Sequence, residues 1–367
     1  MTIIIKPTFN CNFRCSYCYL TNSVKSEYMM MRYEVAESLI SQAIALCRKS
    51  HRKALTLIWH GGEPLLWGVN NYRQMFEYAK EHGKDVRIRQ CVQTNLSLIN
   101  AEYINLFKEY NVRVGFSLDG TKSINDSQRR TINGEGTFDT IMQKVEMCKA
   151  AGLEIGCILV GSKNFVGHIG EVYDFLCANH LNFKFNPLFN AGEAVNAGTS
   201  VAISPNEYAK MAIELFDLWY HDEHNTLKET TFVDIASYFV NKTKRSRGCI
   251  FSANCQDSFM AVSPAGDIFP CGRFCETDTR YSYGNITDES LETIVEKIKK
   301  TEIYARGKHI ANSACSGCKY FQLCHGGCLH DGFLKSGDFK SKTFLCSAYQ
   351  QIFNHIERRV SSLQASL

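Results

Sequence analysis

The first 190 residues alternate between short apolar runs and longer amphipathic runs, and this alternation constrains the fold more than any other feature. Six runs rich in β-branched or aromatic residues have the length of strands, at residues 2–7, 54–60, 87–94, 112–119, 154–160 and 183–189. Helical spacing of apolar residues marks the runs between them, at residues 32–49, 70–82, 101–110, 137–151 and 165–180. This repeat predicts an α/β fold with parallel strands and crossover helices. Two architectures stay open, a doubly wound open sheet and an incomplete barrel.

The most distinctive polar segments directly follow the predicted strands. Three cysteines follow the first strand, and "HGGEP" (His60–Pro64) follows the second. "QTN" (Gln93–Asn95) ends the third strand and "SLDG" (Ser117–Gly120) ends the fourth. Both architectures bind ligands at the carboxyl ends of their strands. We therefore expect these segments to share one site.

The pattern changes after the loop "NPLFNAGEAVNAGTS" at residues 186–200. Two helical runs follow, at residues 204–223 and 232–242, and we interpret them as a bridge between domains. From Cys249 onward the sequence predicts a hairpin over residues 258–270, one helix over residues 289–300 and closely spaced cysteines.

The chain has no basic leader followed by an apolar run, and no segment approaches the roughly 20 apolar residues of a membrane span. We therefore expect a cytoplasmic protein without membrane contact. The formal charge of +4 is spread along the chain, and the short basic run at residues 242–248 is typical of a solvated loop. Nucleic acid is not an expected partner.

Seventeen cysteines in a chain without an export signal favour metal over disulfides, because the cytosol keeps thiols reduced. Five stand alone among apolar residues and are interpreted as small buried hydrophobes: Cys47, Cys91, Cys148, Cys157 and Cys177. The other twelve gather at the two ends of the chain.

The first group is the triplet C-x-x-x-C-x-x-C, formed by Cys11, Cys15 and Cys18. A structural zinc needs four ligands and disulfides need an even number of thiols. Three thiolates can instead hold three irons of a cubane cluster and leave the fourth iron open to an outside ligand. A zinc site completed by a distant His or Cys is the alternative.

With Tyr17 before its last cysteine, the triplet resembles that of the radical S-adenosylmethionine superfamily. The resemblance implies that the open iron chelates S-adenosylmethionine, whose reductive cleavage gives a 5'-deoxyadenosyl radical that abstracts a hydrogen from the substrate. "HGGEP" is similar to the family's glycine-rich segment. There Gly61 and Gly62 would let the backbone approach the methionyl group, and Glu63 would accept from its amino group.

Four further residues fall where related enzymes contact S-adenosylmethionine or the substrate. Ser117 and Arg129 match positions that reach the ribose or the carboxylate, and Arg130 is the alternative to Arg129. Gln93 and Asn95 would point into the same space. A structural role remains open for each of them.

The C-terminal cysteines, with G-x-x-x-x-C at Gly266–Cys271 and C-x-x-C-x-x-x-x-x-C-x-x-x-C at Cys315–Cys328, resemble the SPASM extension of radical peptide-modifying enzymes. The resemblance implies two auxiliary 4Fe-4S clusters, each with four cysteine ligands. The first set would be Cys249, Cys255, Cys271 and Cys328. The second would be Cys315, Cys318, Cys324 and Cys346. Cys275 is left over and is interpreted as a packing cysteine, with a thiol near the substrate as the alternative.

The resemblance implies a partial (β/α)6 TIM-like barrel at residues 1–200, a helical bridge at 201–248 and a cysteine-rich iron-sulfur (SPASM) domain at 249–367. The cofactors would be S-adenosylmethionine and three 4Fe-4S clusters, and the partners a precursor peptide and an electron donor such as flavodoxin or ferredoxin. We expect an oxidative side-chain crosslink: a cyclophane, an ether or a thioether.

Three alternatives to a crosslinking enzyme stay open: an anaerobic sulfatase-maturing enzyme, a peptide epimerase and a zinc-dependent scaffold without chemistry. Sulfatase maturases carry an aspartate directly after the third auxiliary-cluster cysteine, where it can act as a base. This chain has Gly272 at that position.

Overall fold

The computed structural model describes the chain except residues 27–28, 225, 242–247, 277 and 367. The basic run at residues 242–247 therefore lies outside the described residues. Among the described residues, no helix combines the length and the apolar character needed to cross a membrane.

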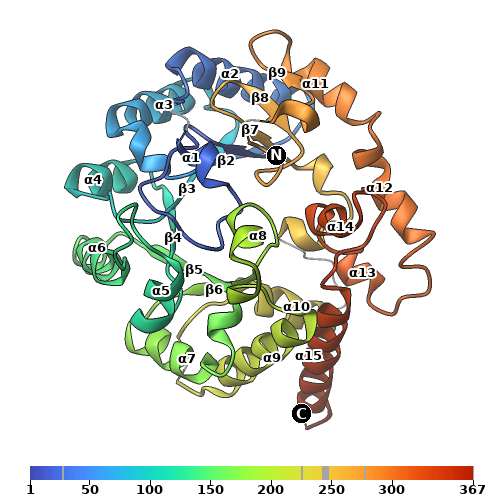
Figure 1. The fold of residues 1–367 in the computed structure, drawn as a ribbon. Coiled ribbons are helices and arrows are strands. Elements are labelled where there is room, and N and C mark those ends of the chain that lie inside the picture. The colour runs from blue at the N-terminus through green and yellow to red at the C-terminus, as the bar shows by residue number, and fades with distance from the viewer. Residues whose placement is uncertain (27–28, 225, 242–247, 277, 367) are drawn as a thin grey trace.

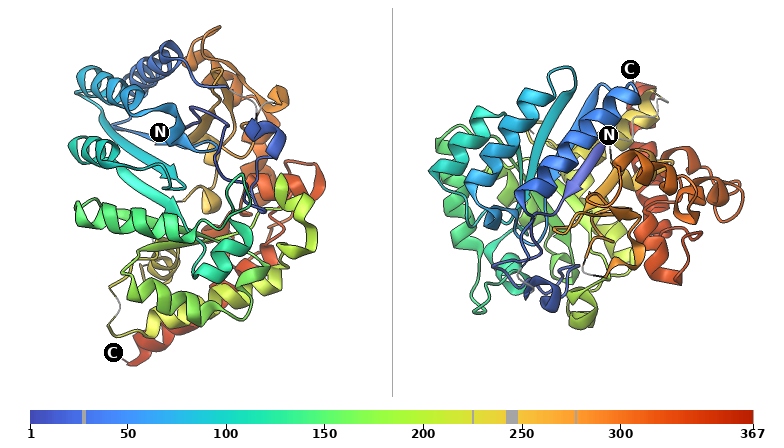
Figure 2. Two further views of the ribbon diagram at one scale, coloured as in Figure 1. Left: turned by 60° about the vertical axis from the view of Figure 1, so that its left-hand side comes forward. Right: turned by 90° about the horizontal axis from the view of Figure 1, so that it is seen from above.

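The strands predicted for the first half of the chain are all present and parallel (Figure 1). They are β1 (Thr2–Ile5), β2 (Ala54–Trp59), β3 (Arg87–Thr94), β4 (Arg113–Ser117), β5 (Ile155–Gly161) and β6 (Phe183–Pro187). The predicted crossover helices are α2 (Tyr33–Lys49), α3 (Val69–His82), α4 (Ala101–Glu109), α6 (Phe138–Ala150) and α7 (Ile169–Ala178). These helices lie along the outer face of the strands (Figure 2), so the sheet is a partial barrel rather than doubly wound.

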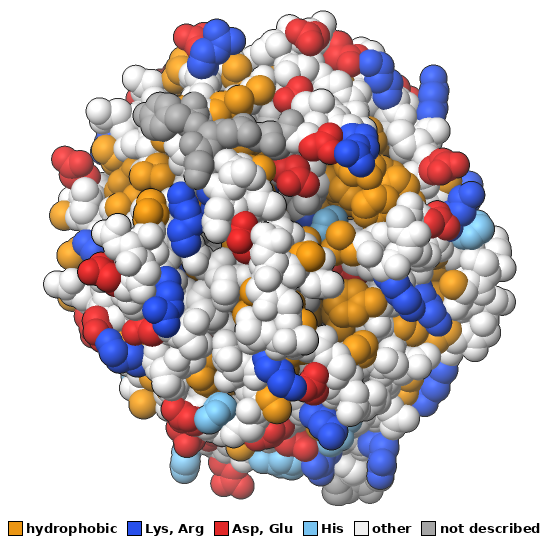
Figure 3. Space-filling model, in the orientation of Figure 1, with side chains coloured by type: hydrophobic (Ala, Val, Ile, Leu, Met, Phe, Trp, Pro, Cys, Tyr) orange, Lys and Arg blue, Asp and Glu red, His pale blue; other side chains and the backbone are white. Residues whose placement is uncertain are grey.

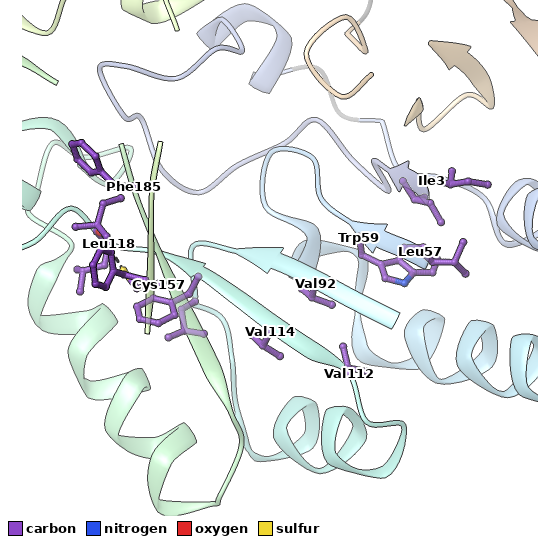
Figure 4. Close-up of a cluster of buried hydrophobic side chains, with 14 of the residues drawn as sticks. Ile3, Leu57, Trp59, Val92, Val112, Val114, Leu118, Cys157 and Phe185 are labelled. Atoms are coloured by element: carbon purple, nitrogen blue, oxygen red, sulfur yellow. Dashed lines mark hydrogen bonds between the residues drawn. The ribbon is translucent and has the colours of Figure 1, made fainter. Parts of the chain in front are cut away.

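Burial alternates along the strands. On β2 the side chains of Leu55, Leu57 and Trp59 are buried against the helices, whereas the intervening side chains are only half-buried. Figure 4 shows the buried layer crossing the sheet, with labelled members Ile3, Leu57, Trp59, Val92, Val114, Cys157 and Phe185. The inner face of the barrel is thus partly open, which leaves room for ligands.

The C-terminal region extends the same sheet. The predicted hairpin forms as β7 (Phe259–Val262) and β8 (Asp267–Phe269), and β9 (Gly284–Asn285) follows. β7 pairs in parallel with β1, which gives a nine-stranded sheet in the order β6-β5-β4-β3-β2-β1-β7-β8-β9. This pairing brings the cysteine-rich segment beside the first strand. The domain limits at residues 200 and 248 stay a prediction.

The remaining helices cover the rest of the sheet and the C-terminal region. The bridge forms α9 (Pro205–His221) and α10 (Thr230–Asn241), and both contact α15 (Cys346–Ser366). The others are α1 (Asn22–Ser26), α5 (Lys122–Gln128), α8 (Glu193–Ala197), α11 (Leu291–Ile298), α12 (Glu302–Ala311), α13 (Phe321–Cys324) and α14 (Leu329–Ser336). Only α11 of this last group was predicted from the sequence.

Figure 3 shows one face of the molecule with basic and acidic side chains intermingled and hydrophobic side chains between them. The described part of this face therefore displays no block of a single charge. This matches the even spread of charge along the sequence.

Candidate active site

The predicted three-cysteine loop runs from the end of β1 across the open end of the barrel. Its backbone is anchored to the segment after α5: the Arg14 N–H donates to the Arg130 carbonyl at 2.7 Å and the Ser16 N–H to the Gln128 carbonyl at 2.9 Å. The three predicted ligands, Cys11, Cys15 and Cys18, are half-buried. The loop is therefore held from outside as well as by its own hydrogen bonds, such as that from the Cys18 N–H to the Cys15 carbonyl.

The thiols of the loop interact with one another. Burial raises the pKa of Cys11 to about 12, and the neighbouring Cys15 and Glu63 add to the rise. Burial also raises the pKa of Cys15, with Arg129 acting in the opposite direction. Crowded thiols of this kind ionise readily only when a cation binds them.

Gly61 and Gly62 are required by the chain's own packing. A Cβ on Gly62 would lie 2.1 Å from the Phe9 carbonyl oxygen and 2.2 Å from that of Asn10. Gly61 has a φ of +127°, and its Cβ would lie 2.3 Å from the Thr8 oxygen. Both glycines let the segment after β2 press against the backbone that enters the cysteine loop. Their predicted approach to a methionyl group stays a prediction.

Glu63 is fully buried and ties two strand ends together. Its carboxylate accepts from the Thr94 hydroxyl at 2.7 Å, the Asn95 N–H at 2.7 Å and the Leu65 N–H at 3.0 Å. Burial raises its pKa, and these donors oppose the rise. In this structure Glu63 is a structural bridge, and its predicted contact with an amino group remains to be tested.

Arg129, rather than Arg130, reaches the site. Arg129 is 4% exposed and donates to the Tyr17 hydroxyl at 2.6 Å, whereas Arg130 is exposed. The Nε of Arg129 has no hydrogen-bond partner among the described residues. The charge of Cys15 acts on the same guanidinium. A buried guanidinium with an unused donor beside the loop suits a ligand carboxylate.

The remaining predicted contacts form two side-chain pairs. Gln93 donates to the Ser117 hydroxyl at 3.2 Å, and both side chains are half-buried. Asn95 donates to the Asn12 side chain at 2.8 Å and lies 3.9 Å from the Cys11 sulfur. The structure brings all four side chains to the carboxyl ends of β3 and β4 or to the loop.

Lys6 is a site residue that the sequence analysis missed. It is fully buried, donates to the Cys275 carbonyl, and lies 4.9 Å from the centre of the Tyr19 ring. It directly follows β1, and the alternation of side chains along a strand places it on the same inner face as Ile4. This alternation is the sequence signal that could have identified Lys6 as a site residue. Lys6 connects the cysteine loop to the C-terminal region.

The C-terminal cysteines influence one another in two groups, and their assignment as ligands of two clusters stays a prediction. Burial raises the pKa of Cys255 to about 11, and Cys271 and Cys249 add repulsion; Cys249 and Cys271 act in the same way on Cys328. Burial raises the pKa of Cys324 to about 12, with repulsion from Cys346, Cys315 and Cys318. The latter four thiols line one cavity. Among the described residues, no three Cys, His, Asp or Glu side chains are arranged to hold a single metal ion.

Cys275 is completely buried in an apolar cluster with Phe9, Phe269 and Phe274. Burial raises the pKa of its thiol to about 12. These contacts match the interpretation as a packing cysteine. Of the five solitary cysteines, Cys47, Cys148 and Cys157 are buried as expected, whereas Cys91 and Cys177 are half-buried.

Comparison with protein families accounts for both cysteine regions. Residues 5–176 match the model of the radical SAM superfamily, and residues 249–319 match SPASM, an iron-sulfur cluster-binding domain. The chain is a radical SAM enzyme with a SPASM domain. S-adenosylmethionine and multiple 4Fe-4S clusters are therefore its cofactors.

Curated relatives of the chain include sulfatase-maturating enzymes. The chain is 27% identical over 99% of its length, and 96% of the relative's, to a cysteine-type anaerobic sulfatase-maturating enzyme of Clostridium novyi. It is 23% identical to a serine-type anaerobic sulfatase-maturating enzyme of Bacteroides thetaiotaomicron, over 96% of this chain and 89% of that one.

Solved structures share the fold. Native anSMEcpe with bound AdoMet has a TM-score of 0.83 at 24% identity and covers 100% of both chains. Streptococcus suis SuiB bound to precursor peptide SuiA has a TM-score of 0.66 at 17% identity, over 94% of this chain and 75% of that one.

The residues of this radical SAM enzyme fit its cofactors. Cys11, Cys15 and Cys18 offer three thiols to a cluster, and the Arg129 Nε offers an unused buried donor to a ligand carboxylate. The C-terminal cysteines offer thiols in two groups of four. The assignment of each ligand and contact remains a prediction.

Proposed function

We propose that this radical SAM enzyme matures a ribosomally made precursor peptide by forming an oxidative crosslink between side chains. The observation that carries the proposal is the residue after Cys271, because this is where the maturases that make formylglycine carry an aspartate. Here that residue is Gly272.

Gly272 packs closely against the first strand. A Cβ at this position would lie 3.3 Å from Cγ2 of Ile4, so a larger residue requires the Ile4 side chain to shift slightly. The guanidinium of the next residue, Arg273, points toward the first auxiliary cysteine set. It donates to Cys328 Sγ at 3.1 Å and to the Asp331 carboxylate at 2.9 Å. A cation cannot deprotonate a substrate thiol or hydroxyl.

When bound and reduced, the cluster and S-adenosylmethionine supply hydrogen-atom abstraction, and the protein supplies placement and exclusion of water. We assign cluster binding to Cys11, Cys15 and Cys18 and carboxylate binding to Arg129. Lys6 holds the loop against the C-terminal region through Tyr19 and the Cys275 carbonyl. Gln93 and Ser117 face the same end of the barrel and can orient the peptide.

The electron balance favours a net two-electron oxidation, such as a crosslink, over a redox-neutral epimerisation. Abstraction removes one hydrogen atom from the peptide, and bond formation to a second side chain releases one proton and one electron. The electron needs an acceptor. All eight auxiliary cysteines are present in two sets, and full thiolate ligation suits a cluster to electron transfer. The SuiB structure, which holds a precursor peptide, supports a peptide substrate.

An epimerase needs a hydrogen donor beside the substrate. Cys275 was the candidate donor, but its thiol is completely buried among aromatic rings. A flavodoxin or ferredoxin is the proposed source of the electron that starts each turnover.

The second candidate is formylglycine formation, favoured by the 27% identity to cysteine-type maturases over nearly the whole chain. Mass spectrometry separates the functions. The enzyme is incubated anaerobically with candidate precursor peptides, and a Cys18→Ala enzyme serves as control. A product lighter by one pair of hydrogens that resists fragmentation between two residues supports the proposal. An aldehyde at a single Cys or Ser, or an unchanged mass with deuterium uptake, contradicts it.

A further inference from the structure

Arg306, on α12, is a buried cation without a matching anion nearby. It is 6% exposed, and no carboxylate of the described residues lies within ion-pair distance. Its Nε has no hydrogen-bond partner among the described residues. Burying a charge in this way is costly unless a compensating charge is present. Arg306 therefore points to an anion that the polypeptide itself does not supply.

The direct partners of Arg306 are neutral. Its Nη2 donates to the Gly326 carbonyl at 3.2 Å and to the Ser341 carbonyl at 3.1 Å. These bonds fix the guanidinium between α12 and the Cys324–Cys328 turn. Asp331 feels the charge of Arg306, but it already pairs with Arg273 at 2.9 Å.

Arg306 is influenced by cysteines of both auxiliary sets. Burial lowers the pKa of its guanidinium, and the thiols that oppose this are Cys328 and Cys255 from the first set and Cys315 and Cys324 from the second. Arg306 lines a cavity with Cys249 and Cys255. Gly326, whose carbonyl it holds, lines the cavity of Cys315, Cys318, Cys324 and Cys346. The side chain thus stands between the two predicted sites.

Arg273 provides an internal comparison. It stacks on the Phe189 ring, at 3.1 Å from the ring centre, and is paired with Asp331. The thiols whose charges act on it, Cys328, Cys271 and Cys249, all belong to the first set. Arg273 is therefore influenced by the first set alone, whereas Arg306 is influenced by both sets.

A cluster held by four thiolates is an anion, and one-electron reduction adds a further negative charge without making or breaking a bond. A nearby buried cation stabilises the reduced form more than the oxidised form, which raises the reduction potential. The effect is strong in a low-dielectric interior.

We propose that Arg306 is a shared positioning cation that raises the reduction potentials of both auxiliary clusters and so poises the pair to accept electrons. The inference rests on the ligand sets given above. It adds to the proposed function a residue that touches neither substrate nor S-adenosylmethionine.

The test is a redox titration of the anaerobic holoenzyme with dithionite as the electron source, followed by electron paramagnetic resonance. Addition of S-adenosylmethionine identifies the signal of the first cluster. The variants are Arg306→Gln, Arg306→Lys and Arg273→Gln, and Lys308→Gln on the exposed side of the same helix is the matched control.

Arg306→Gln should lower the reduction potential of each auxiliary cluster by about 59 mV, which corresponds to a change of about tenfold in the equilibrium constant for one-electron reduction. Arg306→Lys keeps the charge and should restore both. Arg273→Gln should lower one potential only, and Lys308→Gln neither. If Arg306→Gln loses iron, restoration of full iron content by Arg306→Lys also supports the proposal.

The proposal is overturned if Arg306→Gln shifts neither potential or only one, or if the Lys variant is as defective as the Gln variant. The titration needs no peptide. A wild-type enzyme that shows the expected shifts but makes no crosslink therefore refutes the proposed function alone.

Discussion

The two cysteine regions of this enzyme are built in opposite ways. The first is local: three cysteines within eight residues, carried by one loop that neighbouring backbone holds in place. The second is dispersed: its eight predicted ligands span Cys249 to Cys346 and come together only through folding. The three thiols of the first region would leave one iron of a cubane cluster open to a small molecule, whereas the four thiols predicted for each auxiliary cluster would leave none open. This contrast suits the first to chemistry on a ligand and the second to electron transfer.

The largest expected effect separates the two regions. Replacing Cys11, Cys15 and Cys18 by Ala should abolish cleavage of S-adenosylmethionine and leave auxiliary iron in place. Wild-type protein should hold about twelve iron atoms in three clusters, and the variant about eight. Chromatography of 5'-deoxyadenosine and iron analysis measure these outcomes.

Cys346→Ala is the reciprocal control, and should lose iron from one auxiliary cluster but keep cleavage of S-adenosylmethionine. Deoxyadenosine production by the triple variant, or zinc in place of iron in the wild type, would refute the assignment of the first region.

The second expected effect concerns the contact that holds the local site. Gly62→Ala places a methyl group 2.1 Å from the Phe9 carbonyl oxygen, so the cysteine loop must move. We expect a loss of about 100-fold or more in the rate of S-adenosylmethionine cleavage, because displacement by about 1 Å costs that much in comparable sites. Gly170→Ala, on α7 with open space around it, should leave the rate unchanged. Equal rates for the two variants contradict the packing role.

Third, Glu63→Ala should lower the free energy of unfolding by roughly 3 kcal/mol. The substitution leaves the Thr94 hydroxyl and the backbone N–H groups of Asn95 and Leu65 without their acceptor. Anaerobic urea unfolding measures the change. Glu154→Ala, at an exposed position, is the control and should stay within about 0.5 kcal/mol of wild type. If Glu63→Ala weakens only S-adenosylmethionine binding, the carboxylate acts on the ligand rather than on the fold.

The smallest expected effect is a pH dependence in the dispersed region. Burial, with Arg273 and Lys6 nearby, lowers the pKa of His330 to about 3. The folded state therefore prefers the neutral ring: its stabilising contribution is complete above the unfolded pKa of about 6.5 and falls by about 1.4 kcal/mol per pH unit as the pH drops below it. His330→Gln should show a flatter decline of the urea midpoint between pH 6.5 and 5, whereas the exposed His309→Gln should follow wild type. Identical curves for His330→Gln and wild type exclude this contribution.

Much of the fold followed from local patterns. The six strands and five crossover helices of the barrel were predicted from periodicity, because each buries one face against the next element along the chain. Helices α12 to α15 were not predicted, and β7 was expected to belong to a separate domain rather than to pair with β1. The pairing of β7 with β1 joins segments that lie more than 250 residues apart. A prediction from short stretches of sequence cannot detect it, because no short stretch contains both strands.

For the site, the sequence by itself determined the chemistry: the triplet at Cys11–Cys18, the glycine-rich segment and the spacing of the later cysteines identify the cofactor class. Only the tertiary structure decided which neighbours act on those residues. It buried Arg129 and left Arg130 exposed, made Glu63 a bridge between strand ends, and placed Lys6 and Arg306 in the interior. Motif spacing identifies the cofactor class because residue type and interval are properties of the sequence itself, whether the ligands are local, as in the triplet, or dispersed, as in the later cysteines. Burial and charge neighbours arise between distant segments, and they exist only once the chain has folded.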